Sequence, residues 1–289
     1  MTRFRIVPFI LTSSLIAGCI ADTEPEETTG IAQQALSGLV IYSRGTTDGA
    51  DVDLNITDDN WSCFLAGVAG DLSQGVNSTN LGIWGRTAVA GAYVGANGHW
   101  FIAGHGGRSP QGVPYNNPVH AYVACVPGAP TARVNWQKSY TQQQVNAKDL
   151  GPTIGQMCFL SRVYGVGGSW ELSDSSMRVV ASGGHWWLYG HNVYGSNDAG
   201  YAGGDATCIS TPSYLEPYQR TASPNDPGST FNMIWSNNWD AACALRSVTG
   251  AFNQNSWTNG VIASWPQFNP GYWTMQYTGG KGFEAYCMK

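Results

Sequence analysis

The stretch CFLAGVAG at residues 63–70 returns as CFLSRVYG at 158–165 and as CALRSVTG at 243–250. The shared pattern is C-x-L-x-x-V-x-G. Each copy is followed by a tryptophan-containing segment: GHWFIAGH at 98–105, GHWWLYGH at 184–191 and GYWTMQYT at 271–278. A second cysteine then closes each unit. Self-similarity at a fixed period is the signature of a repeat architecture. The sequence therefore predicts three copies of one unit, at residues 37–129, 130–214 and 215–289.

Alternate positions of the tryptophan segment predict a strand with one buried face. Every copy has a tryptophan followed two residues later by an aliphatic residue or methionine, namely Trp100, Ile102, Trp186, Leu188, Trp273 and Met275. The intervening positions differ between copies. Apolar residues at a period of two indicate a half-buried strand, and no segment shows sustained helical periodicity. We expect an all-β fold of three tandem, disulfide-stapled antiparallel repeats. These would be small sandwich-like units, arranged side by side or around a pseudo-threefold axis.

Six cysteines lie in the repeats, and an even number in an exported protein indicates disulfide bonds. Six cysteines allow 15 pairings in principle. Because the two cysteines occupy matching places in every copy, pairing within each unit is the simplest arrangement: Cys63–Cys125, Cys158–Cys208 and Cys243–Cys287. The chain-entropy model assigns such a bridge roughly 4 kcal/mol, which is large for a unit of about 80 residues.

The first residues have the features of a secretory signal. Arg3 and Arg5 precede an apolar run that is too short to span a bilayer, and small residues lead to Cys19. The ending Leu15-Ile-Ala-Gly-Cys19 resembles the lipobox of bacterial lipoproteins. The resemblance implies a signal peptide over 1–18, lipidation of Cys19 and a membrane partner through the lipid anchor. Ile20 follows the cysteine, which points to the outer membrane or the cell surface.

Residues 19–36 are predicted to form a lipidated acidic linker. The segment carries Asp22, Glu24, Glu26 and Glu27 and has no basic or aromatic residue, so it cannot bury enough apolar area to offset its chain entropy. It is similar to the acidic leaders of exported myxobacterial proteins, a resemblance that implies export and says nothing about activity.

Composition favours uncharged ligands over nucleic acid. The formal net charge is −5, and charged residues make up only 11% of the chain. Because no basic cluster is present, the electrostatic footprint of a nucleic-acid-binding protein is missing. A content of 37 Gly and 12 Trp suits loop-rich β structure.

Motifs for catalysis are scarce in the sequence. It contains no G-x-S-x-G, H-E-x-x-H or G-x-x-x-x-G-K pattern, and no pair of carboxylates stands out for glycoside hydrolysis. Two histidines six residues apart on one strand lie about 20 Å apart, too far to share a zinc ion. No metal or other cofactor is predicted. The aspartates at 48, 51, 53, 58 and 59 lack EF-hand spacing and are interpreted as a solvated loop.

Binding is the function class that the residues favour. Aromatic rings stack on sugar rings, and the variable face of the tryptophan segments carries aromatic residues. The candidate ligand-binding residues are His99, Phe101, His185, Trp187, Tyr189 and Tyr272. The leading hypothesis is a surface-anchored, non-catalytic binding or adhesion lipoprotein for a glycan or cell-surface polysaccharide. A structural envelope lipoprotein without a small ligand and an extracellular hydrolase, with or without metal assistance, are the alternatives.

Overall fold

We analysed a computed structural model of the chain. The structure describes residues 31–33, 40–46, 51–73, 88–106, 119–139, 145–193, 201–210, 218–235, 242–253, 260–264 and 272–288. The predicted signal peptide, Cys19 and most of the predicted linker lie outside these ranges. Inside the linker, Ile31–Gln33 form the short strand β1, whose backbone pairs with β2.

Each repeat supplies six of the described strands, in matching order. In the first repeat they are β2 (Val40–Thr46), β3 (Val52–Thr57), β4 (Trp61–Gly70), β5 (Ala88–Val94), β6 (His99–His105) and β7 (Val119–Pro127). In the second they are β8 (Pro130–Ser139), β9 (Lys148–Pro152), β10 (Gln156–Gly165), β11 (Ser176–Ser182), β12 (His185–His191) and β13 (Tyr201–Ser210). In the third they are β14 (Tyr218–Ala222), β15 (Ser229–Trp235), β16 (Ala242–Gly250), β17 (Gly260–Ser264), β18 (Tyr272–Tyr277) and β19 (Lys281–Met288).

The strands form three antiparallel sheets, each built from two repeats. The first sheet has the order β2-β7-β4-β17-β18-β15, with β1 added at β2; the second is β8-β13-β10-β5-β6-β3; the third is β14-β19-β16-β11-β12-β9. Within the described ranges, one parallel pairing, Thr46 with His105, connects the first two sheets. Every repeat thus gives three strands to its own sheet and three to the next one, and the third repeat gives its strands back to the first.

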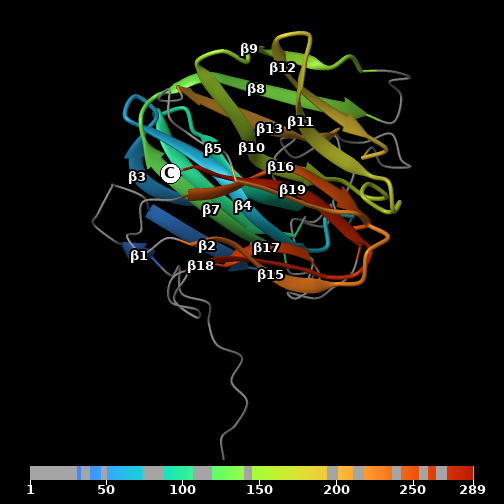
Figure 1. Ribbon diagram of the computed structural model, residues 1–289. Coiled ribbons are helices and arrows are strands. Elements are labelled where there is room, and N and C mark those ends of the chain that lie inside the picture. The colour runs from blue at the N-terminus through green and yellow to red at the C-terminus, as the bar shows by residue number, and fades with distance from the viewer. Residues whose placement is uncertain are drawn as a thin grey trace, which may run out of the picture.

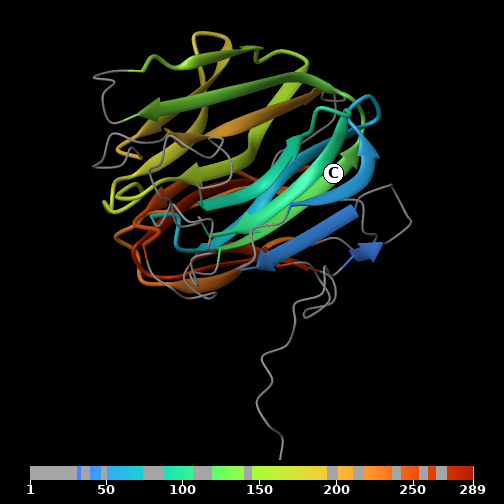
Figure 2. The ribbon, with the colours of Figure 1, turned by 180° about the vertical axis from the view of Figure 1, so that it is seen from behind.

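The all-β, disulfide-bridged organisation is confirmed, and the repeats follow one another around a pseudo-threefold axis. Among the described strands, each sheet is completed by strands of two repeats, and no repeat completes one by itself. The strands with the C-x-L-x-x-V-x-G pattern, β4, β10 and β16, contact one another in all three combinations and lie in the middle of the molecule, with β9 and β12 on one side and β15 and β18 on the other (Figures 1 and 2).

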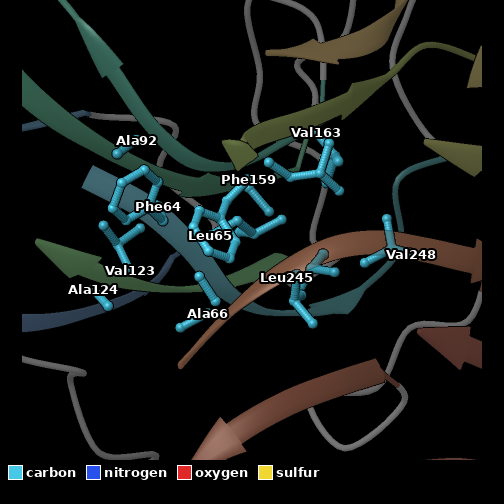
Figure 3. Close-up of a cluster of buried hydrophobic side chains, with 14 of the residues drawn as sticks. Phe64, Leu65, Ala66, Ala92, Val123, Ala124, Phe159, Val163, Leu245 and Val248 are labelled. Atoms are coloured by element: carbon cyan, nitrogen blue, oxygen red, sulfur yellow. The ribbon is translucent and has the colours of Figure 1, made fainter. Parts of the chain in front are cut away.

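The central core consists of side chains from these three strands. Phe64 and Phe159 meet edge to face with ring centroids 5.1 Å apart, and Leu65, Leu245 and Val248 are also fully buried (Figure 3). The predicted bridges Cys63–Cys125, Cys158–Cys208 and Cys243–Cys287 are all present. Each joins the central strand to the last strand of the same repeat.

The predicted buried face of the tryptophan segments is confirmed. Trp100, Trp186 and Trp273 are at most 7% exposed. The indole N–H of Trp100 donates to the carbonyl oxygen of Trp61 at 2.9 Å, and that of Trp186 donates to Gln156 at 3.0 Å. Both acceptors lie two residues before the first cysteine of their unit. The tryptophan therefore fixes the start of each of these two central strands as well as filling the core.

One end of the molecule is closed by a chain of backbone hydrogen bonds between the repeats. Leu72 N–H donates to Phe252 at 2.7 Å, and Phe252 N–H donates to Trp170 at 2.8 Å. All three side chains are fully buried. The glycine that ends the repeated pattern permits this closure. Gly70 and Gly250 have positive φ, a conformation in which glycine has no steric penalty.

Candidate functional site

An aspartate–histidine pair lies at the start of β6. The Nδ1 atom of His99 is 2.9 and 3.1 Å from the two carboxylate oxygens of Asp53 on β3. The backbone N–H of Asn55 donates to the same carboxylate at 2.8 Å, and Asn55 has a φ of 55°. These hydrogen bonds, from Asn55 first and then from His99, lower the pKa of Asp53 below its usual value. An ionised carboxylate only accepts, so His99 donates from Nδ1.

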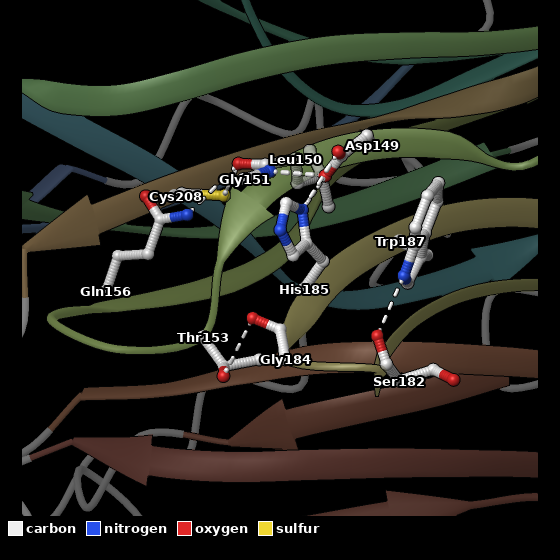
Figure 4. Close-up of polar contacts among 10 residues, drawn as sticks. All are labelled: Asp149, Leu150, Gly151, Thr153, Gln156, Ser182, Gly184, His185, Trp187 and Cys208. Atoms are coloured by element: carbon white, nitrogen blue, oxygen red, sulfur yellow. Dashed lines mark hydrogen bonds and ion pairs between the residues drawn. The ribbon is translucent and has the colours of Figure 1, made fainter.

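The second repeat contains the same arrangement. His185 Nδ1 is 2.9 and 3.0 Å from the Asp149 oxygens, and Gly151 N–H donates to Asp149 at 2.8 Å (Figure 4). The hydrogen bonds from Gly151 and His185 lower the pKa of Asp149. In the third repeat, Asn232 lies opposite Thr274, just as Asp149 lies opposite Trp187 in the second repeat. Asn232 therefore takes the position of the aspartate, and Tyr272 takes that of the histidine. The third repeat thus lacks both members of the pair.

Aromatic rings lie beside both pairs. Phe101 stacks on Tyr93 with centroids 5.6 Å apart. Trp187 donates its indole N–H to the Ser182 carbonyl oxygen at 3.0 Å and lies next to His185 on β12 (Figure 4). Tyr189 is half-buried on the same strand.

The predicted ligand-binding residues therefore do not form one pocket. His99 and Phe101 belong to the second sheet, whereas His185, Trp187 and Tyr189 belong to the third. Tyr272 lies on β18 of the first sheet, and its side chain is outside the described residues.

The aspartates at 51, 53 and 58 are paired, in contrast to the solvated loop expected for them. Asp51 accepts a hydrogen bond from the hydroxyl of Tyr93 at 2.5 Å and lies 3.1 Å from Nε2 of His105. Burial opposes ionisation of Asp51, but the hydrogen bonds from His105 and Tyr93 outweigh it, so its pKa is lowered. Across the described ranges, no three His, Cys, Asp or Glu side chains come together as metal ligands.

A cleft of about 390 Å³ opens in the second sheet, between strands that come from different repeats. Pairing of β5 with β10 stops at Gly91 and Arg162. Gly91 has a φ of 128°, and a Cβ on it would lie 2.3 Å from the Ser161 carbonyl oxygen. Beyond this point the strands diverge. The cleft is lined by Tyr93, Val94, Trp100, Arg133, Val134, Asn135, Ser161, Arg162, Asp205, Ala206 and Thr207.

A buried ion pair organises the polar wall of the cleft. Arg162 and Asp205 are 2.6 Å apart, with side chains only 9% and 16% exposed. The guanidinium of Arg162 lies over the rings of Tyr93, at 4.7 Å, and Tyr164, at 5.4 Å. Asn135 donates to both Tyr164 and Asp205. Burial and the hydrogen bond to Asp51 raise the pKa of Tyr93, so the ring remains neutral. Aromatic, amide and charged groups are thus arranged around the cleft through mutual hydrogen bonds and ring contacts.

The repeat explains why this cleft is open. A β-bulge interrupts each central strand at the same position, which is occupied by Ala66, Ser161 and Arg246 in the three repeats. In the third sheet the guanidinium of Arg246 lies 4.3 Å from the rings of both Trp186 and Tyr286. Trp186 and Tyr286 correspond to Trp100 and Thr207 in the second sheet. The long side chain thus fills the space that Ser161 leaves empty.

None of the predicted ligand-binding residues lines the cleft, and Phe101 contacts its lining by stacking on Tyr93. Tyr93, Arg162 and Asp205 lie on three strands whose pairing crosses between repeats, and no local pattern connects them. One signal was present: in the aligned C-x-L-x-x-V-x-G segments, one position carries side chains of different size, Ala66, Ser161 and Arg246.

No protein family could be matched to the chain, and no curated protein shows significant sequence similarity to it. Among the described residues, none forms a helix with the length and apolar character that crossing a bilayer demands.

Proposed function

We propose that the chain is a non-catalytic carbohydrate-binding protein of the cell envelope, with the cleft of the second sheet as its binding site. The open cleft beside Ser161, in a position that Arg246 fills in the third sheet, is the observation that carries the proposal. A preformed concave site with an apolar wall and a few fixed polar groups is the usual form of a small-ligand site.

The lining suits a polyhydroxylated ligand. Tyr93 and Val94 offer apolar surface, while Asn135, Arg133 and Thr207 offer donors and acceptors for hydroxyl groups. In the second sheet, the pair His99–Asp53 adds polar groups beside Phe101, which stacks on Tyr93 of the cleft lining. The pair His185–Asp149 lies beside Trp187 in the third sheet, outside the cleft.

The carboxylates of the cleft favour binding over hydrolysis. Asp205 is the only carboxylate in the lining as far as the described residues define it, and it is paired with Arg162. Glycoside hydrolysis commonly uses two carboxylates on opposite sides of the scissile bond.

Attachment to the envelope is proposed from the lipobox. Acylation of Cys19 with several chains would hold the protein durably on a membrane, because each buried methylene contributes about 0.8 kcal/mol. Metabolic labelling with a fatty-acid analogue tests this part: the label should be incorporated by the natural chain and lost in Cys19→Ser.

A glycan and polysaccharide array with the full chain tests the binding proposal. We expect at least one ligand to be retained by the natural protein and lost in Ser161→Arg, which copies the filled site of the third sheet. Asn135→Ala, at the exposed edge of the cleft, should weaken the same ligand, and Thr221→Ala at the corresponding place in the third sheet should not. Absence of all glycan binding, or undiminished binding by a folded Ser161→Arg protein, would rule out this site.

A further inference from the structure

A second ion pair links a residue of the cleft lining to a neighbouring turn of another repeat. Arg133 on β8, which lines the cleft, lies 2.7 Å from Asp58, in the turn between β3 and β4. Arg133 belongs to the second repeat and Asp58 to the first. Their side chains are 43% and 20% exposed, so the pair is formed in contact with water.

The two ion pairs at the cleft differ in their ability to exchange partners. Arg162 and Asp205 are nearly buried and are packed against aromatic rings. Separating a buried pair leaves an uncompensated charge and is strongly unfavourable. The exposed pair Arg133–Asp58 gains little from its contact, because water and salt screen both charges. Arg133 is therefore the cation that is able to accept a new anion at little energetic cost.

Among the described residues, no such exposed pair is found at the matching positions of the other sheets. The strand register places Gln219 of the third sheet at the position of Arg133. Thr153 takes the place of Asp58. The backbone N–H of Asp58 donates to the carbonyl of Gly98, and that of Thr153 donates to the carbonyl of Gly184, the first glycine of the tryptophan segment in each repeat. In the first sheet the position of Arg133 belongs to Ile41. The charged pair thus accompanies the open cleft of the second sheet, whereas the filled position of the third sheet has uncharged residues.

We propose that the cleft recognises an acidic sugar, such as a uronic acid residue, and that Arg133 exchanges Asp58 for the carboxylate of that sugar. This inference rests on the proposed carbohydrate-binding function and names the class of sugar. In the absence of ligand, Asp58 forms the ion pair with Arg133 that the carboxylate of the sugar would form in the complex. A planar carboxylate matches the two parallel N–H donors of a guanidinium, while the sugar ring lies along Tyr93 and Asn135.

Substitutions of Arg133 and of Asp58 should have opposite effects on the affinity for an acidic sugar, and this difference tests the inference. Isothermal titration of the full chain would compare oligomers of galacturonate, glucuronate and mannuronate with their methyl-esterified forms and with a sulfated galactan oligomer. We expect a uronate oligomer to bind at least tenfold more tightly than its ester. Arg133→Gln should weaken this binding by about tenfold, as for the loss of a charge-assisted hydrogen bond. Asp58→Asn, which removes the competing anion, should strengthen it severalfold. Asp58→Asn should leave binding of the ester unchanged, and Arg133→Gln should weaken binding of the ester less than binding of the uronate.

Each other outcome overturns the inference. If the Arg133–Asp58 pair had only a structural role, Arg133→Gln and Asp58→Asn would both weaken binding. Thermal unfolding would show whether the two variants are equally folded. Equal affinity for uronate and ester, or for uronate and sulfated galactan, would exclude recognition of a carboxylate. In these cases, neutral-glycan binding that is lost in Ser161→Arg would still support the proposed function. Failure of every glycan to bind would end both proposals.

Discussion

Replacing Arg246 by Ser should convert the filled position of the third sheet into a copy of the open cleft. Arg246 is 6% exposed and is held between the rings of Trp186 and Tyr286, with its Nη1 atom 3.7 Å from Glu284. Two partly desolvated cation–π contacts contribute about 1 kcal/mol each, and the contact with the Glu284 carboxylate contributes about 1 kcal/mol more. The vacated space opens to water, so no dry cavity adds to the loss. The free energy of unfolding should therefore fall by about 3 kcal/mol.

Urea unfolding followed by tryptophan fluorescence measures this change. Arg220→Ser on the adjoining part of the third sheet is the control, because Arg220 is exposed and such surface substitutions change stability by about 0.5 kcal/mol or less. Trp186 should also become accessible to acrylamide in Arg246→Ser and not in the control. A loss of stability no larger than that of Arg220→Ser, or an unchanged Trp186, would show that Arg246 does not fill a cleft.

Three further predictions concern the bridges and the titrating groups. Replacing Cys158 and Cys208 together by Ala should lower the free energy of unfolding by roughly 4 kcal/mol. Peptide mapping of the unreduced natural protein should recover only bridges within a repeat. A bridge between repeats would contradict the structure. Asp53 and Asp149 have folded pKa values below the ordinary 3.8, so their contribution to stability is complete above about pH 4 and is lost as the pH falls through the lowered values. Acid unfolding followed by circular dichroism should consequently be shallower in a protein with both changed to Asn, and an identical acid profile would refute this. Burial lowers the pKa of Lys281 to about 8. Between pH 8 and about 10 this lysine is therefore protonated more in the unfolded chain than in the folded protein, so the free energy of unfolding rises with pH over that range. Lys281→Met should remove the rise, whereas an equal slope in the variant would assign it to other groups.

The sequence contained most of the information about what is buried. The alternation around Trp100 and Trp186 depends on side-chain direction alone, and strand geometry imposes that direction wherever one face is buried. The cysteine pairing followed from matching positions in the repeats, and the structure confirms it for Cys63–Cys125 and its two counterparts.

The pairing between repeats was not predictable in the same way. The apolar run of β5 indicates that the strand is buried but not which strand will lie beside it, and β5 pairs with β10 of the next repeat. The candidate site depends on that partner, because Tyr93 and Arg162 meet only across this junction. His105 shows the same limit: it lies on the face of the segment that differs between repeats, yet it contacts Asp51 and is only 6% exposed.

The exchange of strands around the axis sets the order in which the molecule can be completed. The edge of β4 (Trp61–Gly70) is closed by β17 (Gly260–Ser264), near the opposite end of the chain. During synthesis, the edge of β4 therefore stays unpaired until β17 has been made. A nascent chain of this design cannot finish its first sheet early, and a prematurely terminated product carries unpaired β4 backbone that is ready to capture another copy.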